Sequence, residues 1–169
     1  MNDIDTTDPL GTDVSEVNTE YPVLPAKLYD FRISKVEKTT TKETQEKNLS
    51  PGDEGYSEML VFNLETTHET KDEKGNAVPP GHTLKHRVSL TVKAARNENG
   101  REIRAYTVED IKKNIAQVAK SAGLSGTVRS FIENPAAFVG QAVRANVKIS
   151  KETEQYGRSN NIGSFEVVS

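Results

Sequence analysis

Residues 107–123, with the sequence TVEDIKKNIAQVAKSAG, contain the strongest helical signal in the chain. Thr107 is placed to cap the N-terminus, Asp110 stands three residues later in a variant of the capping box, and Gly123 can end the helix. Apolar residues recur at three- and four-residue spacing and form one stripe: Val108, Ile111, Ile115, Val118, Ala119 and Ala122. The pattern therefore predicts a single helix over residues 107–122.

Strand-like alternation flanks this helix on both sides. Three stretches with apolar side chains at every second position precede it, over residues 27–36, 57–66 and 82–93. Two more follow it, over residues 142–150 and 161–168. A helix between the third and fourth strands is the connectivity of an OB-fold. We therefore expect a mainly β protein: a five-stranded OB-like Greek-key barrel with one helix between strands three and four.

The alternation also assigns one face of each strand to the core. The predicted inward rows are Tyr29, Phe31 and Ile33; Leu60, Phe62 and Leu64; Leu84, Val88, Leu90 and Val92; and Val143, Ala145, Val147 and Ile149. The polar stretch 39–55 predicts a long loop between the first two strands. Residues 128–139 predict a short turn or helix broken at Pro135.

The first 20 residues differ from the rest of the chain in charge. They hold six of the 25 carboxylates and no Lys or Arg, so the remaining 149 residues carry 22 basic and 19 acidic side chains. A segment with few large apolar residues cannot offset the entropy lost on ordering. We expect residues 1–20 to form a flexible acidic arm and residues 21–169 to form one OB-like nucleic-acid-binding domain. The arm acts as a solubilising tail, or it competes with nucleic acid for the basic surface or recruits partners.

Composition argues against several classes of function. Without cysteine, and with three scattered histidines, the chain offers no familiar metal-ligand spacing. No nucleophile motif stands near a histidine, and the glycines do not form a phosphate-binding loop. We expect neither an enzyme nor a cofactor. The absence of a long apolar run and of a secretory signal predicts a soluble protein of the cytoplasm.

A binding surface for nucleic acid remains. Single strands are held by a positive groove along the backbone and by flat side chains on which bases stack. Cations line the predicted outer faces of the strands, and tyrosines stand in the two loops that flank an OB-fold's binding groove. The predicted contacts are Arg32, Tyr56, Lys85, Arg87, Arg144, Lys148, Tyr156 and Arg158.

Several short segments carry a family resemblance. They are VLPAKLYDFRI at 23–33, MLVFNL at 59–64, AGL at 122–124, FVGQ at 138–141 and YGRSNNI at 156–162. Together they resemble bacteriophage single-stranded DNA-binding proteins over residues 21–169. The resemblance implies an OB-fold that coats single-stranded DNA during phage replication or recombination in the bacterial cytoplasm, alongside replication or recombination proteins. Many such proteins carry their acidic tail at the C-terminus, whereas here the acidic segment is N-terminal.

Two other classes of protein fit the same patterns. A phage virion or decoration protein with a small β-barrel would form ordered oligomers and have no affinity for nucleic acid. An inhibitor that binds a host protein through the acidic arm would lose activity when residues 1–20 are deleted, whereas a DNA binder would not. Exposed barrel edges can also pair between copies, so a homo-oligomer is compatible with the pattern.

Overall fold

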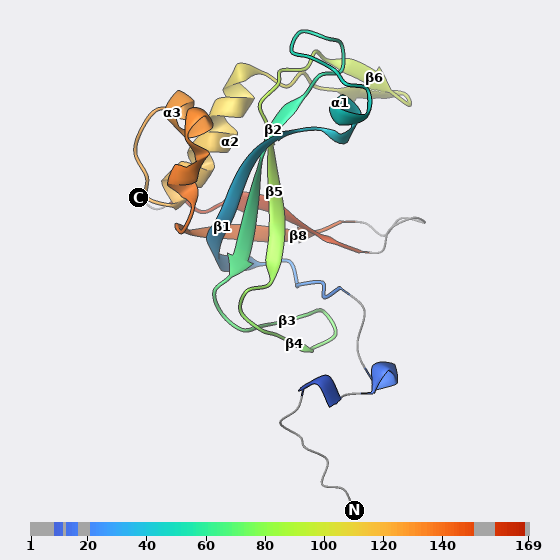
Figure 1. The fold of residues 1–169 in the computed structure, drawn as a ribbon, viewed down its shortest axis with the longest axis vertical. Coiled ribbons are helices and arrows are strands. Elements are labelled where there is room, and N and C mark those ends of the chain that lie inside the picture. Colours follow the sequence, from blue (N-terminus) through green and yellow to red (C-terminus); the bar gives the residue numbers. More distant parts are fainter. Residues whose placement is uncertain (1–8, 12, 17–20, 151–157, 168–169) are drawn as a thin grey trace, which may run out of the picture.

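The computed structural model of the chain describes residues 9–11, 13–16, 21–150 and 158–167. A five-stranded sheet dominates it, with all neighbouring strands antiparallel in the order β5-β2-β1-β8-β9 (Figure 1). These strands are β1 (Leu28–Thr40), β2 (Glu58–Thr66), β5 (Thr83–Ser89), β8 (Ala142–Ile149) and β9 (Asn160–Phe165). The prediction of a mainly β fold is confirmed.

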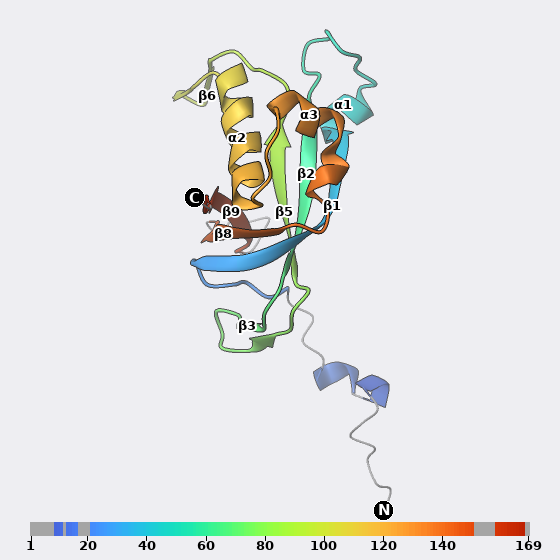
Figure 2. The same cartoon turned by 90° about the vertical axis from the view of Figure 1, so that its left-hand side faces the viewer.

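Strand β1 takes part in both halves of this sheet. Residues 28–32 pair with β8, and most of the remaining length pairs with β2. The pairing with β2 shifts register between Ile33 and Lys35, which marks a β-bulge, and a bulge bends the strand that carries it. The sheet curls accordingly, so that β8 and β9 pass behind β1, β2 and β5 in the first view and to one side of them in the second (Figures 1 and 2).

The inward rows of the strands form the core. The side chains predicted to point inward on β1, β2 and β8 are buried, apart from the half-buried Ile149 at the end of β8. The largest fully buried side chains come from these strands, the short helices and the segment before β1: Phe31, Phe62, Phe138, Leu24, Ile33, Leu60 and Leu64. Period-2 alternation was therefore a sufficient guide to the core of these strands.

Helix α2 (Val108–Ser121) lies between β5 and β8 in the chain, as predicted. Its capping box is complete, because the Thr107 side chain accepts from the Asp110 N–H while the Asp110 carboxylate accepts from the Thr107 N–H. Gly123 follows with a φ of +70°. The prediction is wrong at Val108, which is 56% exposed. The stripe buries four apolar side chains: Ile111, Ile115, Val118 and Ala119.

Two short helices follow α2 and match the predicted helix broken at Pro135. They are α3 (Val128–Glu133) and the 3-10 helix η3 (Pro135–Phe138). The ring centroids of Phe131 and Phe138 lie 4.9 Å apart, and Phe138 lies 5.2 Å from Phe62 on β2. Among the described residues, no helix is long and apolar enough to cross a membrane.

The third strand is shorter than predicted. Strand β5 ends at Ser89, and the chain then leaves the sheet, so that Leu90 is half-buried and Val92 is 53% exposed instead of pointing inward. A bridge between Lys93 and Tyr106 replaces the sheet pairing. The intervening chain forms a separate hairpin of β6 (Arg96–Glu98) and β7 (Arg101–Ile103).

The loops contain more regular structure than the sequence indicated. Strand β1 continues into the stretch predicted as loop, and helix α1 (Lys42–Glu46) follows, capped by the Thr41 hydroxyl at 3.3 Å from the Thr44 nitrogen. After β2 the chain forms a second hairpin, of β3 (Thr70–Lys71) and β4 (Ala77–Val78). These elements are too short to produce a periodic signal in the sequence.

Only part of the predicted acidic arm falls within the described residues. There the chain forms two single 3-10 turns, η1 (Pro9–Gly11) and η2 (Val14–Glu16). Inside η1 and η2, the side chains of Leu10 and Val14 are exposed. The other residues of the arm lie outside the described residues, and the flexibility expected for residues 1–20 stays a prediction.

The two edge strands, β5 and β9, approach each other at their inner faces. The ring centroid of His86 on β5 lies 5.0 Å from that of Phe165 on β9 and 5.9 Å from that of Phe62. Within the described ranges no backbone ladder joins β5 and β9. The packed rings of Phe62, His86 and Phe165 therefore fill the space between the two edge strands, here called the seam.

Residues 21–27, here called the N-terminal strap, cross this seam. The Tyr21 hydroxyl donates to the Thr83 carbonyl on β5 at 2.7 Å. The Asn160 side chain on β9 bonds to the backbone N–H and the carbonyl of Leu24, at 2.8 and 2.9 Å. Because Leu24 is also fully buried, the strap ties both edge strands to the core.

Candidate nucleic-acid interface

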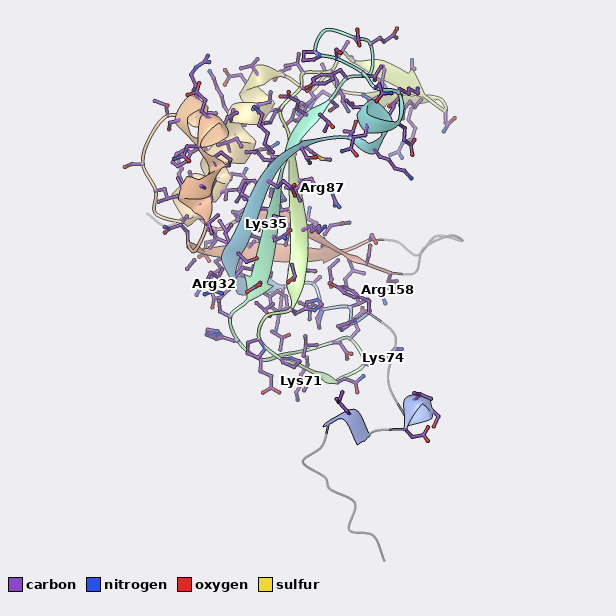
Figure 3. All side chains as sticks on the ribbon, in the orientation of Figure 1. Arg32, Lys35, Lys71, Lys74, Arg87 and Arg158 are labelled. Atoms are coloured by element: carbon purple, nitrogen blue, oxygen red, sulfur yellow. The ribbon has the colours of Figure 1, made fainter. Side chains whose placement is uncertain are left out.

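The outer face of β1, β2 and β5 brings three cations together. Register places Lys85 of β5 opposite Asn63 of β2, and Asn63 opposite Lys35 of β1. Two residues further along β5, on the same face, Arg87 is opposite Val61 of β2. We call these five residues the cationic face; Lys35 and Arg87 are labelled in Figure 3. Because neighbouring strands lie about 4.8 Å apart, the backbones of Lys85 and Lys35 are separated by about 10 Å.

The cations of this face are available to a ligand. Lys85 and Arg87 are exposed, and in the described part of the chain no carboxylate lies within ion-pair distance of either. Lys35 lies 3.7 Å from Glu37, but both side chains are largely exposed, and such pairs contribute little free energy. A phosphate group could therefore replace water at Lys85 and Arg87 without breaking an ion pair.

Arg32 and Arg158 flank the cationic face but are paired. Arg32 lies 3.4 Å from Glu65, its cross-strand neighbour on β2. Arg158, just before β9, lies 2.8 Å from Glu73 in the hairpin of β3 and β4 (Figure 3). The Glu73 N–H in turn donates to a strap carbonyl at 2.8 Å. The Arg158 pair therefore also fastens the hairpin and the strap to β9.

The structure does not bring Arg144 to the cationic face. Arg144 lies on β8, behind β1, β2 and β5 in Figure 1, where its Nε is 2.7 Å from Asp30 and its Nη1 is 3.5 Å from Glu166. The hydrogen bond to Asp30 and the charges of both carboxylates raise the pKa of Arg144. These three side chains line a cleft of about 630 Å³ with His68 and Ser121. The positive charge of Arg144 is therefore compensated within the protein.

Lys148 also lies on β8, apart from the cationic face. It is exposed, and its aliphatic stem crosses Gly163 on β9 so closely that a Cβ at that glycine would stand 2.7 Å from the lysine Cε. The sequence predicted one row of cations along one side of the barrel. The structure divides that row between β5 and β8.

The predicted aromatic contacts are less accessible than expected. Tyr56 is half-buried, and its hydroxyl donates to the Glu58 carboxylate, which raises the pKa of Tyr56. Tyr156 lies outside the described residues. No aromatic side chain stands on the outer face of β1, β2 or β5 within their described bounds. A base-stacking surface would therefore have to come from the segments around the sheet.

Sequence reasoning missed two residues of this region, Lys35 and Tyr21. Strict alternation from Ile33 would turn Lys35 inward, but the bulge reverses the order, so that Val36 packs on the core and Lys35 is exposed. Tyr21 is 68% exposed and is fixed by its bond to Thr83. The only signal for Tyr21 was its position at the start of the predicted domain.

The two histidines of this region, His82 and His86, are half-buried. His86 points inward between aromatic rings, and burial lowers its pKa to about 4. Burial also lowers the pKa of His82. In residues 9–11, 13–16, 21–150 and 158–167, no group of His, Asp and Glu side chains could hold a metal ion.

Comparison with protein-family models and with curated proteins found no match for this chain. The cationic face and its surroundings therefore carry the functional argument.

Proposed function

We propose that residues 21–169 form an OB-like Greek-key barrel that binds single-stranded DNA with little sequence preference. The observation that supports this most directly is the pair of exposed, unpaired cations Lys85 and Arg87 on the outer face of the sheet. In OB-folds the face of the second and third strands and the loops beside it bind oligonucleotides. By position in the chain, β2 and β5 correspond to those two strands.

The chemistry of the face suits a nucleic acid backbone. Arg87 can present two parallel N–H donors to a phosphate, and Lys85 and Lys35 supply point charges on either side of Asn63. Neither Asn63 nor the apolar Val61 gives a full set of base-edge contacts, which favours sequence-independent binding. A single strand is preferred to a duplex because its bases are free to stack on side chains.

The role that follows is the one implied by the resemblance to phage proteins. The chain would coat and protect single strands during phage replication or recombination in the host cytoplasm, without a cofactor. Replication or recombination proteins would be its partners.

The test is fluorescence anisotropy of a labelled oligo-dT of about 30 nucleotides, a length that exceeds one OB-fold's footprint, against a matched duplex. We expect binding to the single strand alone, and weaker binding as salt rises. If Lys35, Lys85 and Arg87 each neutralise one phosphate, the plot of log affinity against log salt should have a slope of about −2. Flat curves for both ligands would overturn the proposal and favour a virion or protein-binding role.

A further inference from the structure

The cationic face accounts for phosphate contacts but not for base contacts. A protein that holds single strands normally adds aromatic rings on which bases stack. Among the described residues, the tyrosine with the largest exposed fraction is Tyr21, at 68%. It lies in the N-terminal strap, outside the sheet.

The ring of Tyr21 is held in place at two points. Its hydroxyl donates to the Thr83 carbonyl at 2.7 Å, and its centroid lies 5.2 Å from the His82 ring with an interplanar angle of 42°. The His82 carbonyl accepts from Thr66 on β2, so the next carbonyl, that of Thr83, points to the opposite, outer edge of β5. Tyr21 therefore occupies the free edge of the sheet.

This anchor places Tyr21 at the β5 edge that borders the cationic face: its hydroxyl bonds to Thr83, whose side chain shares the outer face with Lys85, while its ring packs on His82 at the other face. Thr83 precedes Lys85 by two residues, about 7 Å along a strand, and Arg87 follows after the same interval. The strap passes the N-terminal end of β5 (Figure 1). A nucleic acid backbone that follows Arg87 and Lys85 toward the start of β5 would thus bring a base to the tyrosine.

We propose that Tyr21 is a base-stacking platform at the β5 edge of the cationic face. This inference rests on the proposed function and adds its base-contacting residue. An exposed ring already fixed by Thr83 and His82 loses little conformational entropy when a base stacks on it. With the hydroxyl bonded to Thr83 and one side of the ring against His82, the rest of the 68% exposed side chain is the surface offered to a ligand.

The test compares oligo-dT with an abasic oligomer of the same length, which has the same charge but no bases. Tyr21→Ala should weaken oligo-dT binding about tenfold and leave abasic binding unchanged. Tyr21→Phe keeps the ring but loses the anchor, so it should weaken oligo-dT binding less than Tyr21→Ala does. An equal loss on both oligomers, or no loss on oligo-dT, would overturn the inference. If the unmodified protein binds neither oligomer, the proposed function itself fails.

A second variant answers the question without relying on a loss of affinity. The chain contains no tryptophan, so Tyr21→Trp introduces a single tryptophan at the proposed platform, whose emission can be excited apart from that of the remaining tyrosines. Saturating oligo-dT should quench its emission by stacking, whereas saturating abasic oligomer should not. Unchanged emission with oligo-dT would contradict the platform. Thermal melting of each variant should first show that the domain is folded.

Discussion

Two regions of the sheet carry an arginine on an outward strand position, and only one of them has a free charge. On the cationic face, Arg87 stands opposite the neutral Val61, and in the described part of the chain no carboxylate lies within ion-pair distance of it. In the cleft behind it, Arg144 lies between Asp30 and Glu166. The two arginines follow the same alternating pattern in the sequence. The difference shows that a cation's availability depends on carboxylates contributed by other strands.

Acidification should have the largest effect, because it acts on the fold that supports both regions. His86 has a pKa of about 4 in the folded protein, against an ordinary value of 6.5. Between these values the unfolded chain binds a proton that the folded chain does not, so stability falls as pH drops from 6.5 to 4. The loss from this residue is about 3 kcal/mol. Urea denaturation at a series of pH values measures it.

The control for this prediction is His86→Leu, which removes the titrating group from the seam. The variant should lose most of the pH dependence between 6.5 and 4, apart from a contribution of the same sign from His82, whose pKa is also lowered. Asp110, with a pKa of about 2, acts only below the ordinary carboxyl value of 3.8. An identical pH profile in both proteins would show that His86 is not the cause.

Charge reversal on the cationic face should have the next largest effect. Lys85→Glu with Arg87→Glu replaces two attractive contacts with repulsion, so we expect oligo-dT affinity to fall at least about 100-fold. Anisotropy measures the loss. The matched control reverses Lys113 and Lys120, two exposed lysines on α2, and should change affinity less than about twofold. Equal losses of oligo-dT affinity in the two double variants would mean that net charge, and not the cationic face, governs binding.

Removing the two charges without reversing them should change the salt dependence of oligo-dT binding. Lys85→Ala with Arg87→Ala removes two phosphate contacts, so the salt slope should become shallower by about 1.4. Affinities at four or more salt concentrations give the slope. A weaker affinity with an unchanged slope would mean that the two side chains support the face without touching phosphate.

The smallest effect is expected in the cleft. Arg144→Ala should change oligo-dT affinity less than about twofold, because Asp30 and Glu166 already neutralise this charge. It should leave the salt slope unchanged, and the same anisotropy series measures both. A loss comparable to that of the double variant Lys85→Ala with Arg87→Ala would contradict the contrast between the two regions.

Local patterns predicted the parts of this fold that depend on local chemistry. The capping box at Thr107 and the inward rows of β1, β2 and β8 follow from residues a few positions apart. The β-bulge between Ile33 and Lys35 has no such signature, and it decides which face Lys35 occupies. Strand length was also beyond the pattern, because alternation continues past Ser89 after the chain has left the sheet.

The site was predicted less completely, because its properties depend on contacts between distant residues. Asp30 neutralises Arg144 across 114 positions of sequence, and Thr83 anchors Tyr21 across 62. Neither partner can be identified from the residues around it. Residue type and alternation identified Lys85 and Arg87 as outward cations. Only the contacts made in the folded protein distinguish them from Arg144, which is paired with carboxylates.

The hydrogen bonds between Leu24 and Asn160 have a consequence for folding during translation. The two residues are 136 positions apart, so at roughly 5 to 20 residues per second about 7 to 30 s of translation separate them. In the later part of that interval, after residue 89, β5 has been made but β9, which carries the Asn160 partner of Leu24, has not. Until β9 has been made, the nascent domain therefore exposes a sheet edge to neighbouring chains and chaperones.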